Sequence, residues 1–176
     1  MKSRKESFIG LASENDLRIA LHYVDAFKVL YESNKYQDQI VIPALFLIRQ
    51  FLELGLKYNI RKLSSISGSS NLINDLSKTH DLCKIYGSFL DHYKNAKKNL
   101  GISGLKDGNL LKDLDSLVNL IIPFDNDSMG YRYSEDQNGN KLIDINSTYN
   151  LENVYKLLET TSCFISSTED VFGLTS

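Results

Sequence analysis

Residues 42–63 read IPALFLIRQFLELGLKYNIRKL and form a long apolar stretch, around which we expect the fold to be built. On a helix drawn through this stretch the apolar side chains cover most of the circumference, with Pro43 near the start. A helix that is apolar nearly all round is buried against several partners at once. We therefore predict that this stretch is the central helix, with Pro43 tolerated near its first turn or placed at a kink.

One polar stripe interrupts this apolar surface. Arg49, Glu53 and Lys57 follow each other at intervals of four residues and therefore share one face of the helix. Glu53 before Lys57 is the favourable order for such a pair. Gly55 in the middle of a helix costs roughly 1 kcal/mol relative to alanine unless another segment packs closely there. This stripe of charged residues on an otherwise apolar helix is the first candidate for a functional site.

Four further segments show apolar residues at helical spacing. We expect a cap for the first among residues 13–16, a cap for the next at Thr79, and an end for the fourth helix at Pro123. Residues 64–77 are rich in Ser, Asn and Gly and are predicted to be a connection with few core contacts. The four segments are residues 17–31, 82–93, 110–121 and 151–165.

These patterns predict an all-α fold. We expect an up-and-down bundle of four to five helices in a single domain spanning residues 1–176. Between residues 124 and 147 the helical period is lost, and Asn138-Gly139 is a turn signal, so a short loop or β-hairpin insertion is predicted there. A length of 176 residues with 42% hydrophobic content supports one domain with a substantial core.

The composition limits the classes of function. The net charge of -2 gives no global attraction for phosphate or anionic lipid, so any contact with nucleic acid must be local. We find no signal peptide and no apolar run of the ~18 residues that span a bilayer, which favours a cytoplasmic protein without membrane contact. Cys83 and Cys163 lie in helical patterns without nearby ligand partners, and we expect buried reduced thiols.

No metal or cofactor is expected. The stretch DNDSMG at residues 125–130 is similar to the start of a calcium loop, but the glutamate at the twelfth position and the correctly placed glycine are missing. Solvated turn acids are therefore the simpler interpretation. The sequence also lacks a Gly-x-Ser-x-Gly elbow and a local Cys-His signature. The acids concerned are Asp125, Asp127, Glu135, Asp136 and Asp144.

Three short motifs resemble the HEPN superfamily, and they occur in that family's order. Arg49, Glu53, Leu56 and Lys57 form the pattern ArgxxxGluxxLeuLys, His80-Asp81-Leu82 opens the following helix, and Tyr131-Arg132-Tyr133 precedes acidic residues. The resemblance covers residues 42–165 and implies a helical domain of prokaryotic defence or toxin–antitoxin systems.

Members of this family commonly cleave RNA without metal through an Arg and a His separated by four to six residues. That motif is absent here, because the nearest pair, Arg18 and His22, has three intervening residues. The resemblance therefore implies either a divergent ribonuclease or a non-catalytic member.

We single out Arg49, Glu53 and His80 as candidate catalytic residues, with Lys57 and Asp81 as candidate substrate-binding residues. If the start of the third helix returns toward the C-terminal end of the second, an imidazole, two cations and a carboxylate meet, and they can hold a phosphate and move a proton. The alternative is structural. In that case Arg49, Glu53 and Lys57 form an internal ion-pair ladder, and His80 fixes the connection.

Tyr131, Arg132 and Tyr133 are further candidate substrate-binding residues. A guanidinium between two aromatic rings is suited to stacking on a base and reaching a phosphate. Alternatively, Arg132 closes its loop onto Glu53 or a backbone carbonyl.

The first helix also carries an aromatic stripe, Tyr23, Phe27 and Tyr31, which suggests an association surface. The partners we expect are therefore RNA or a nucleotide, together with a homodimer partner or another protein. The function predicted from the sequence is RNA or nucleotide recognition, and the alternative is a module that regulates a partner enzyme or effector.

Overall fold

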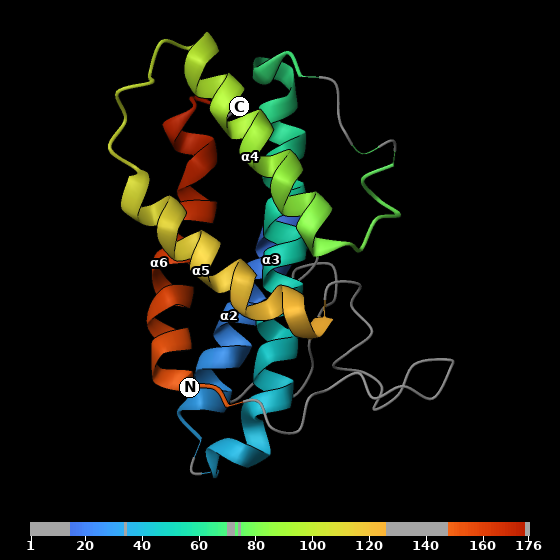
Figure 1. Cartoon of the computed structure of the whole chain (residues 1–176), viewed down its shortest axis with the longest axis vertical. Helices are drawn as coiled ribbons and strands as arrows, with labels where there is room; N and C mark the ends of the chain where they lie inside the picture. The colour runs from blue at the N-terminus through green and yellow to red at the C-terminus, as the bar shows by residue number, and fades with distance from the viewer. Residues whose placement is uncertain (1–14, 34, 70–72, 74, 126–147, 175–176) are drawn as a thin grey trace, which may run out of the picture.

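The computed structural model describes residues 15–33, 35–69, 73, 75–125 and 148–174 (Figure 1). The prediction of an all-α helical bundle is confirmed. The loop or β-hairpin predicted near residues 124–147 lies outside the described residues, except for its first two positions, which are helical. The helices are α2 (Asp16–Tyr31), α3 (Gln37–Ser67), α4 (Leu82–Asn99), α5 (Gly108–Asp125) and α6 (Leu151–Val171).

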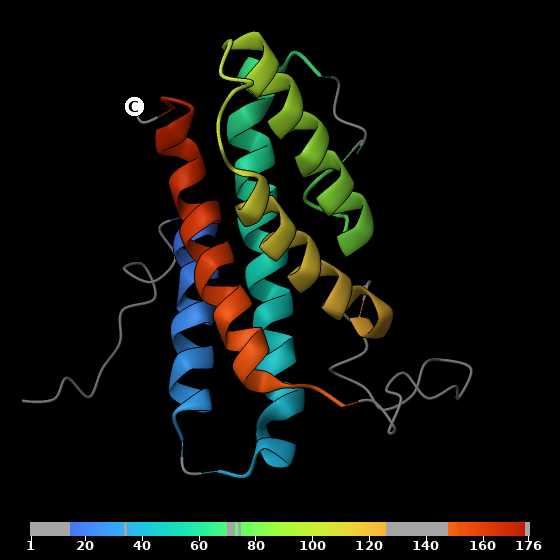
Figure 2. The same cartoon turned by 60° about the vertical axis from the view of Figure 1, so that its left-hand side comes forward.

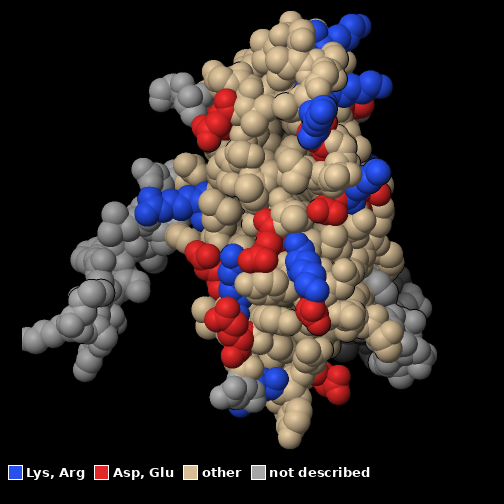
Figure 3. Space-filling model, turned by 90° about the vertical axis from the view of Figure 1, so that its left-hand side faces the viewer, with Lys and Arg blue, Asp and Glu red and all other residues tan. Residues whose placement is uncertain are grey.

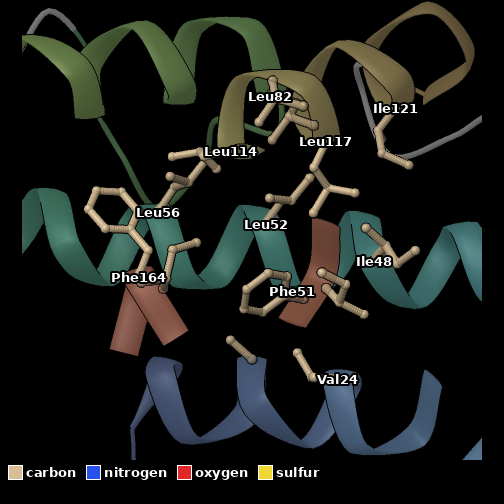
Figure 4. Packing of buried hydrophobic residues seen from close by; sticks show 14 of the residues in the cluster. Val24, Ile48, Phe51, Leu52, Leu56, Leu82, Leu114, Leu117, Ile121 and Phe164 are labelled. Carbon is tan, nitrogen blue, oxygen red and sulfur yellow. The ribbon is translucent and has the colours of Figure 1, made fainter. Parts of the chain in front are cut away.

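Helix α3 is the central element, as the apolar stretch predicts. It contacts each of the other four described helices. Phe51, Leu52 and Leu56 are fully buried, and Figure 4 shows side chains of α3 meeting Val24 of α2 on one side and Leu114 and Leu117 of α5 on the other. Burial on several sides explains why the stretch shows almost no polar face.

Helix α3 extends beyond the predicted stretch at both ends. It starts six residues before Pro43 and continues through the serines of the predicted connection to Ser67, where Gly68 adopts the left-handed conformation that ends many helices. The hydroxyl of Ser64 donates to the carbonyl of Arg61 at 2.7 Å, which satisfies the polar side chain within the helix.

Neither proline ends a helix. Pro43 lies inside α3, and Pro123 lies inside α5, which continues to Asp125, so the prediction that Pro123 stops the fourth helix is wrong. Because Pro43 has no N–H, the carbonyl four residues earlier loses its helical donor. Figure 2 shows the first turn of α3 leaning away from the axis of the rest of the helix, as expected of a kink.

Helix α4 runs in the same direction as α3, which departs from a strict up-and-down order. His80, just before α4, contacts Glu53 in the middle of α3, and Asn99 at the end of α4 bonds to the carbonyl of Ile66 near the end of α3. The fourteen residues 68–81 connect the two helices, and by His80 the chain has returned to the middle of α3. From Glu53 to Ser67 the helix rises about 21 Å, a distance that fourteen extended residues can span.

Helix α6 approaches α3 closely at Gly55. A Cβ atom on Gly55 would lie 2.9 Å from Cγ2 of Ile165, closer than real Cβ atoms come. Beside it, the side-chain amide of Asn59 donates to the backbone carbonyl of Ile165 at 2.9 Å. The close approach of α6 is the reason for a glycine in the middle of the central helix.

The aromatic stripe of α2 is used within the chain. Phe27 is fully buried, and its ring lies 6.0 Å from that of Tyr31 and 6.1 Å from that of Tyr155 on α6. Phe27 and Tyr31 therefore pack against α6 within the chain, whereas Tyr23 and Tyr31 are only partly buried. The association surface and the homodimer stay predictions.

The two cysteines also differ from expectation. Cys83 on α4 and Cys163 on α6 both lie in helices, as predicted, but both are exposed. Each stands one or two positions away from buried residues such as Leu82 and Phe164, so the helical pattern located the segment but not the face.

The described surface mixes charges of both signs. Figure 3 shows acidic and basic side chains interspersed over one face, without a large area of a single sign. Helix α3 is long and apolar enough, by length and composition, to cross a membrane. However, 56% of its apolar 18-residue segment is buried inside the bundle. The core helix of a bundle meets the same criteria.

Candidate functional site

The polar stripe of α3 forms a buried ionic cluster. Arg49 is 0% exposed, and Glu53 and Lys57 are each 4% exposed. Nη1 of Arg49 lies 2.7 Å from Oε2 of Glu53, and Nζ of Lys57 lies 2.8 Å from Oε1 of the same carboxylate. The spacing of four residues places both cations on the face of Glu53, as predicted.

His80 joins this cluster from the residues just before α4. Its Nδ1 atom lies 2.8 Å from Oε1 of Glu53, and its backbone carbonyl accepts a hydrogen bond of 2.5 Å from Nη2 of Arg49. The His80 side chain is nevertheless 55% exposed. The predicted convergence of these residues with Lys57 is confirmed, although α4 begins beside the middle of α3 and not near its C-terminal end. We refer to Arg49, Glu53, Lys57 and His80 as the Glu53 cluster.

Asp81 fixes the start of α4. Its Oδ1 accepts a hydrogen bond of 3.0 Å from the backbone N–H of Lys84, and its Oδ2 lies 3.1 Å from Nζ of Lys84. Asp81 is thus the N-cap, so the prediction of Thr79 in this position is wrong. A carboxylate at the N-cap satisfies a free N–H and favours the positive end of the helix dipole. The cap determines where His80 enters the cluster.

Electrostatics keep Glu53 ionised. Burial raises the pKa of the Glu53 carboxyl, but the hydrogen bonds and charges of Lys57 and Arg49 lower it further, so its pKa lies below the ordinary value. Arg49 and Lys57 both donate to this carboxylate, and Nδ1 of His80 lies within hydrogen-bond distance of it. A buried charge of this kind is stable only while its partners are present.

The cluster combines features of structure and of chemistry. An ionised carboxylate bonded to an imidazole orients the ring, and such a pair is an arrangement that general acid–base catalysis uses. The two cations, in contrast, are buried and directed at Glu53. Therefore, within this cluster His80 is the side chain that a ligand can reach directly.

The other candidate substrate-binding residues are Tyr131, Arg132 and Tyr133. They lie outside the described residues, so their roles stay predictions. Arg18 and His22, which lack the spacing of the family's motif, are exposed on α2. Over residues 15–125 and 148–174, as far as they are described, no group of three or more His, Cys, Asp or Glu side chains is placed to hold a metal ion.

A second polar contact between α3 and α4 was missed by sequence reasoning. Oγ of Ser67 lies 2.7 Å from Nδ1 of His92, and both residues are buried. The amide of Asn99 donates to the carbonyls of Ile66 and Ser67 at 2.9 and 3.1 Å. The sequence feature that points to this contact is the position of His92, which follows Phe89 of the apolar stripe by three residues and so lies on the buried face of α4. We call Ser67, His92 and Asn99 the Ser67 cluster.

The comparisons with known proteins give no assignment. No protein-family model matches the chain, and no curated protein and no solved structure resembles it significantly.

Proposed function

We propose that this chain is a HEPN-like domain that recognises RNA or a nucleotide at the junction of α3 and α4, with His80 as the group that contacts the ligand. The observation that carries the proposal is the hydrogen bond between His80 and the ionised Glu53, in which a buried carboxylate holds a half-exposed imidazole. Such a pair can accept a proton from a ribose hydroxyl and return one to a leaving oxygen.

The arrangement of the motifs supports the resemblance. The Arg49-Glu53-Lys57 stripe and the His80-Asp81-Leu82 segment are 23 residues apart in sequence, counted from Lys57 to His80, and they lie against each other in the structure. Convergence of two motifs that define a family is expected if they form one site. The role in prokaryotic defence or in a toxin–antitoxin pair rests on the same resemblance.

Cleavage of RNA without metal is the direct test. We would incubate the pure protein with total RNA in the presence of a chelator and compare it with the His80→Ala variant. The matched control is His22→Ala. His22 is also exposed, but it lies on α2, which packs on the other side of α3 from α4 (Figure 2). Cleavage that is lost only in His80→Ala supports a ribonuclease, and cleavage that persists in it contradicts the role of His80.

Arg49→Ala is a less specific variant. Arg49 is fully buried and holds both Glu53 and the backbone of His80, so its removal disturbs the fold as well as the site. We would therefore use it only together with a measurement of its thermal unfolding. A folded Arg49→Ala protein that still cleaves RNA would remove Arg49 from the candidate catalytic residues.

A second function is favoured by the burial of the cations. Arg49 and Lys57 are directed at Glu53, whereas a phosphate-binding site needs cations that a ligand can approach. This arrangement suits a non-catalytic module that regulates a partner enzyme or effector. If no sample cleaves RNA and wild-type protein does not bind RNA, this second function is supported.

A further inference from the structure

We infer that the Glu53 cluster holds the neutral His80 ring in a single tautomer, with the proton on Nδ1 and a bare lone pair on Nε2. The site thereby selects ligands that offer a hydrogen-bond donor, such as a hydroxyl group. The identity of the ligand rests on the proposed function, whereas the tautomer follows from the contacts of Glu53 alone.

The geometry leaves one direction for the hydrogen bond between the ring and the carboxylate. Nδ1 of His80 and Oε1 of Glu53 are 2.8 Å apart, and an ionised carboxylate only accepts. The lowered pKa of Glu53 keeps it in that form. If the proton were on Nε2 instead, two lone pairs would face each other at this distance. The neutral ring must therefore donate from Nδ1.

The surrounding contacts prevent the ring and the carboxylate from separating. Arg49 binds Oε2 of Glu53 and, through its other terminal nitrogen, the carbonyl of His80, so one guanidinium ties the acceptor to the backbone of the donor. Lys57 shares Oε1 with the ring. Since Lys57 offers only donors, it cannot replace the carboxylate as the acceptor for Nδ1. Glu53 is thus a positioning residue for His80.

The exposed part of the ring then has a defined chemical preference. A neutral imidazole that donates from one nitrogen accepts at the other, and the His80 side chain is 55% exposed. The matching group on a ligand is a donor of a single hydrogen bond. In nucleic acids the ribose 2′-hydroxyl is such a donor, and DNA lacks it at the same place. Such a hydroxyl is one ligand group that fits the exposed nitrogen, and the identity of the ligand rests on the proposed function.

Nitrogen-15 spectra of the histidine rings, recorded on the labelled full chain at a pH where the rings are neutral, test the tautomer. The His80 signals are assigned by their loss in His80→Gln, and His22, exposed on α2, is the internal comparison. We expect His80 to show a protonated Nδ1 and an unprotonated Nε2. A majority of the opposite tautomer, or an even mixture of the two, would overturn the inference.

Titration with a short RNA oligonucleotide tests whether the exposed nitrogen meets the proposed ligand. We expect RNA to shift the Nε2 signal of His80. A fixed tautomer with no response to RNA would leave the inference on the ring intact and would count against the proposed function.

Discussion

Two histidines face α3 from the same side of the bundle, and their surroundings are opposite. His80 is half exposed and bonded to an ionised carboxylate within a cluster of charges. His92 is buried and bonded to the neutral hydroxyl of Ser67. The first arrangement keeps the ring accessible to solvent, and the second removes a similar ring from solvent. Both residues are histidines that contact α3. They differ in solvent accessibility and in the charge of the bonded side chain, and these two properties distinguish a candidate functional histidine from a structural one.

The largest effect is expected at the charged cluster. Glu53→Gln removes the carboxylate that balances two buried cations, and breaking such a buried arrangement costs roughly 3–5 kcal/mol of the free energy of unfolding. Urea denaturation measures this loss. The matched control is Glu152→Gln, which breaks an exposed pair with Lys156 at the same spacing and is expected to change stability little. Equal losses in the two variants would show that burial of the cluster contributes nothing.

The neutral cluster should respond less strongly. Ser67→Ala removes the hydrogen bond to the buried His92 ring, and we expect a loss of about 1–3 kcal/mol in the same measurement. Ser65→Ala, on the exposed side of the same helical turn, is the control and should leave stability unchanged or slightly raised, because alanine is the better helix former. A loss in Ser67→Ala as large as that in Glu53→Gln would remove the distinction between the two clusters.

The pH dependence of stability provides a third test. Burial lowers the pKa of His92, and the charge of Asp91 opposes this only in part. The unfolded chain therefore binds a proton at this histidine before the folded chain does, so the contribution to stability is complete above about pH 6.5 and decreases as the pH falls below it. His92→Gln should flatten that part of the curve in urea denaturation. Parallel curves for wild type and variant would contradict a buried neutral imidazole.

The smallest effect on stability is expected for His80→Ala. Glu53 keeps Arg49 and Lys57 as partners, and the lost ring is half exposed, so we expect a change of less than about 1 kcal/mol. Thermal unfolding measures it, and the contrast with Ser67→Ala sharpens the comparison between the two histidines. A loss above about 3 kcal/mol would make His80 a structural residue of the core.

The sequence predicts the helices and the charged cluster because both depend on local periodicity. Spacing of four residues places Arg49, Glu53 and Lys57 on one face in any helix, and apolar residues on all sides of residues 42–63 indicate burial. The approach of His80 was conditional on where the next helix begins, and α4 begins beside the middle of α3. That position depends on tertiary contacts that residue spacing does not reveal.

The contacts that sequence reasoning missed are those in which a polar residue is buried by its partner. Ser67 lies in a serine-rich segment that is typical of a connection, yet it is buried in contact with His92. Cys83 and Cys163 are exposed although each is adjacent in sequence to a buried residue, because neighbouring positions in a helix point in different directions. The contact of Phe27 on α2 with Tyr155 on α6 likewise depends on where α6 packs, which local spacing does not reveal.

The parallel course of α3 and α4 has an electrostatic consequence. Helix α6 also runs with α3, as the ion pair of Lys62 with Glu169 near the ends of both helices shows, so three C-termini gather at one pole of the bundle (Figure 1). The partial negative charges of three helix ends therefore lie near one another at this pole. Lys97 and Lys98, in the last turn of α4, supply positive charge at this pole.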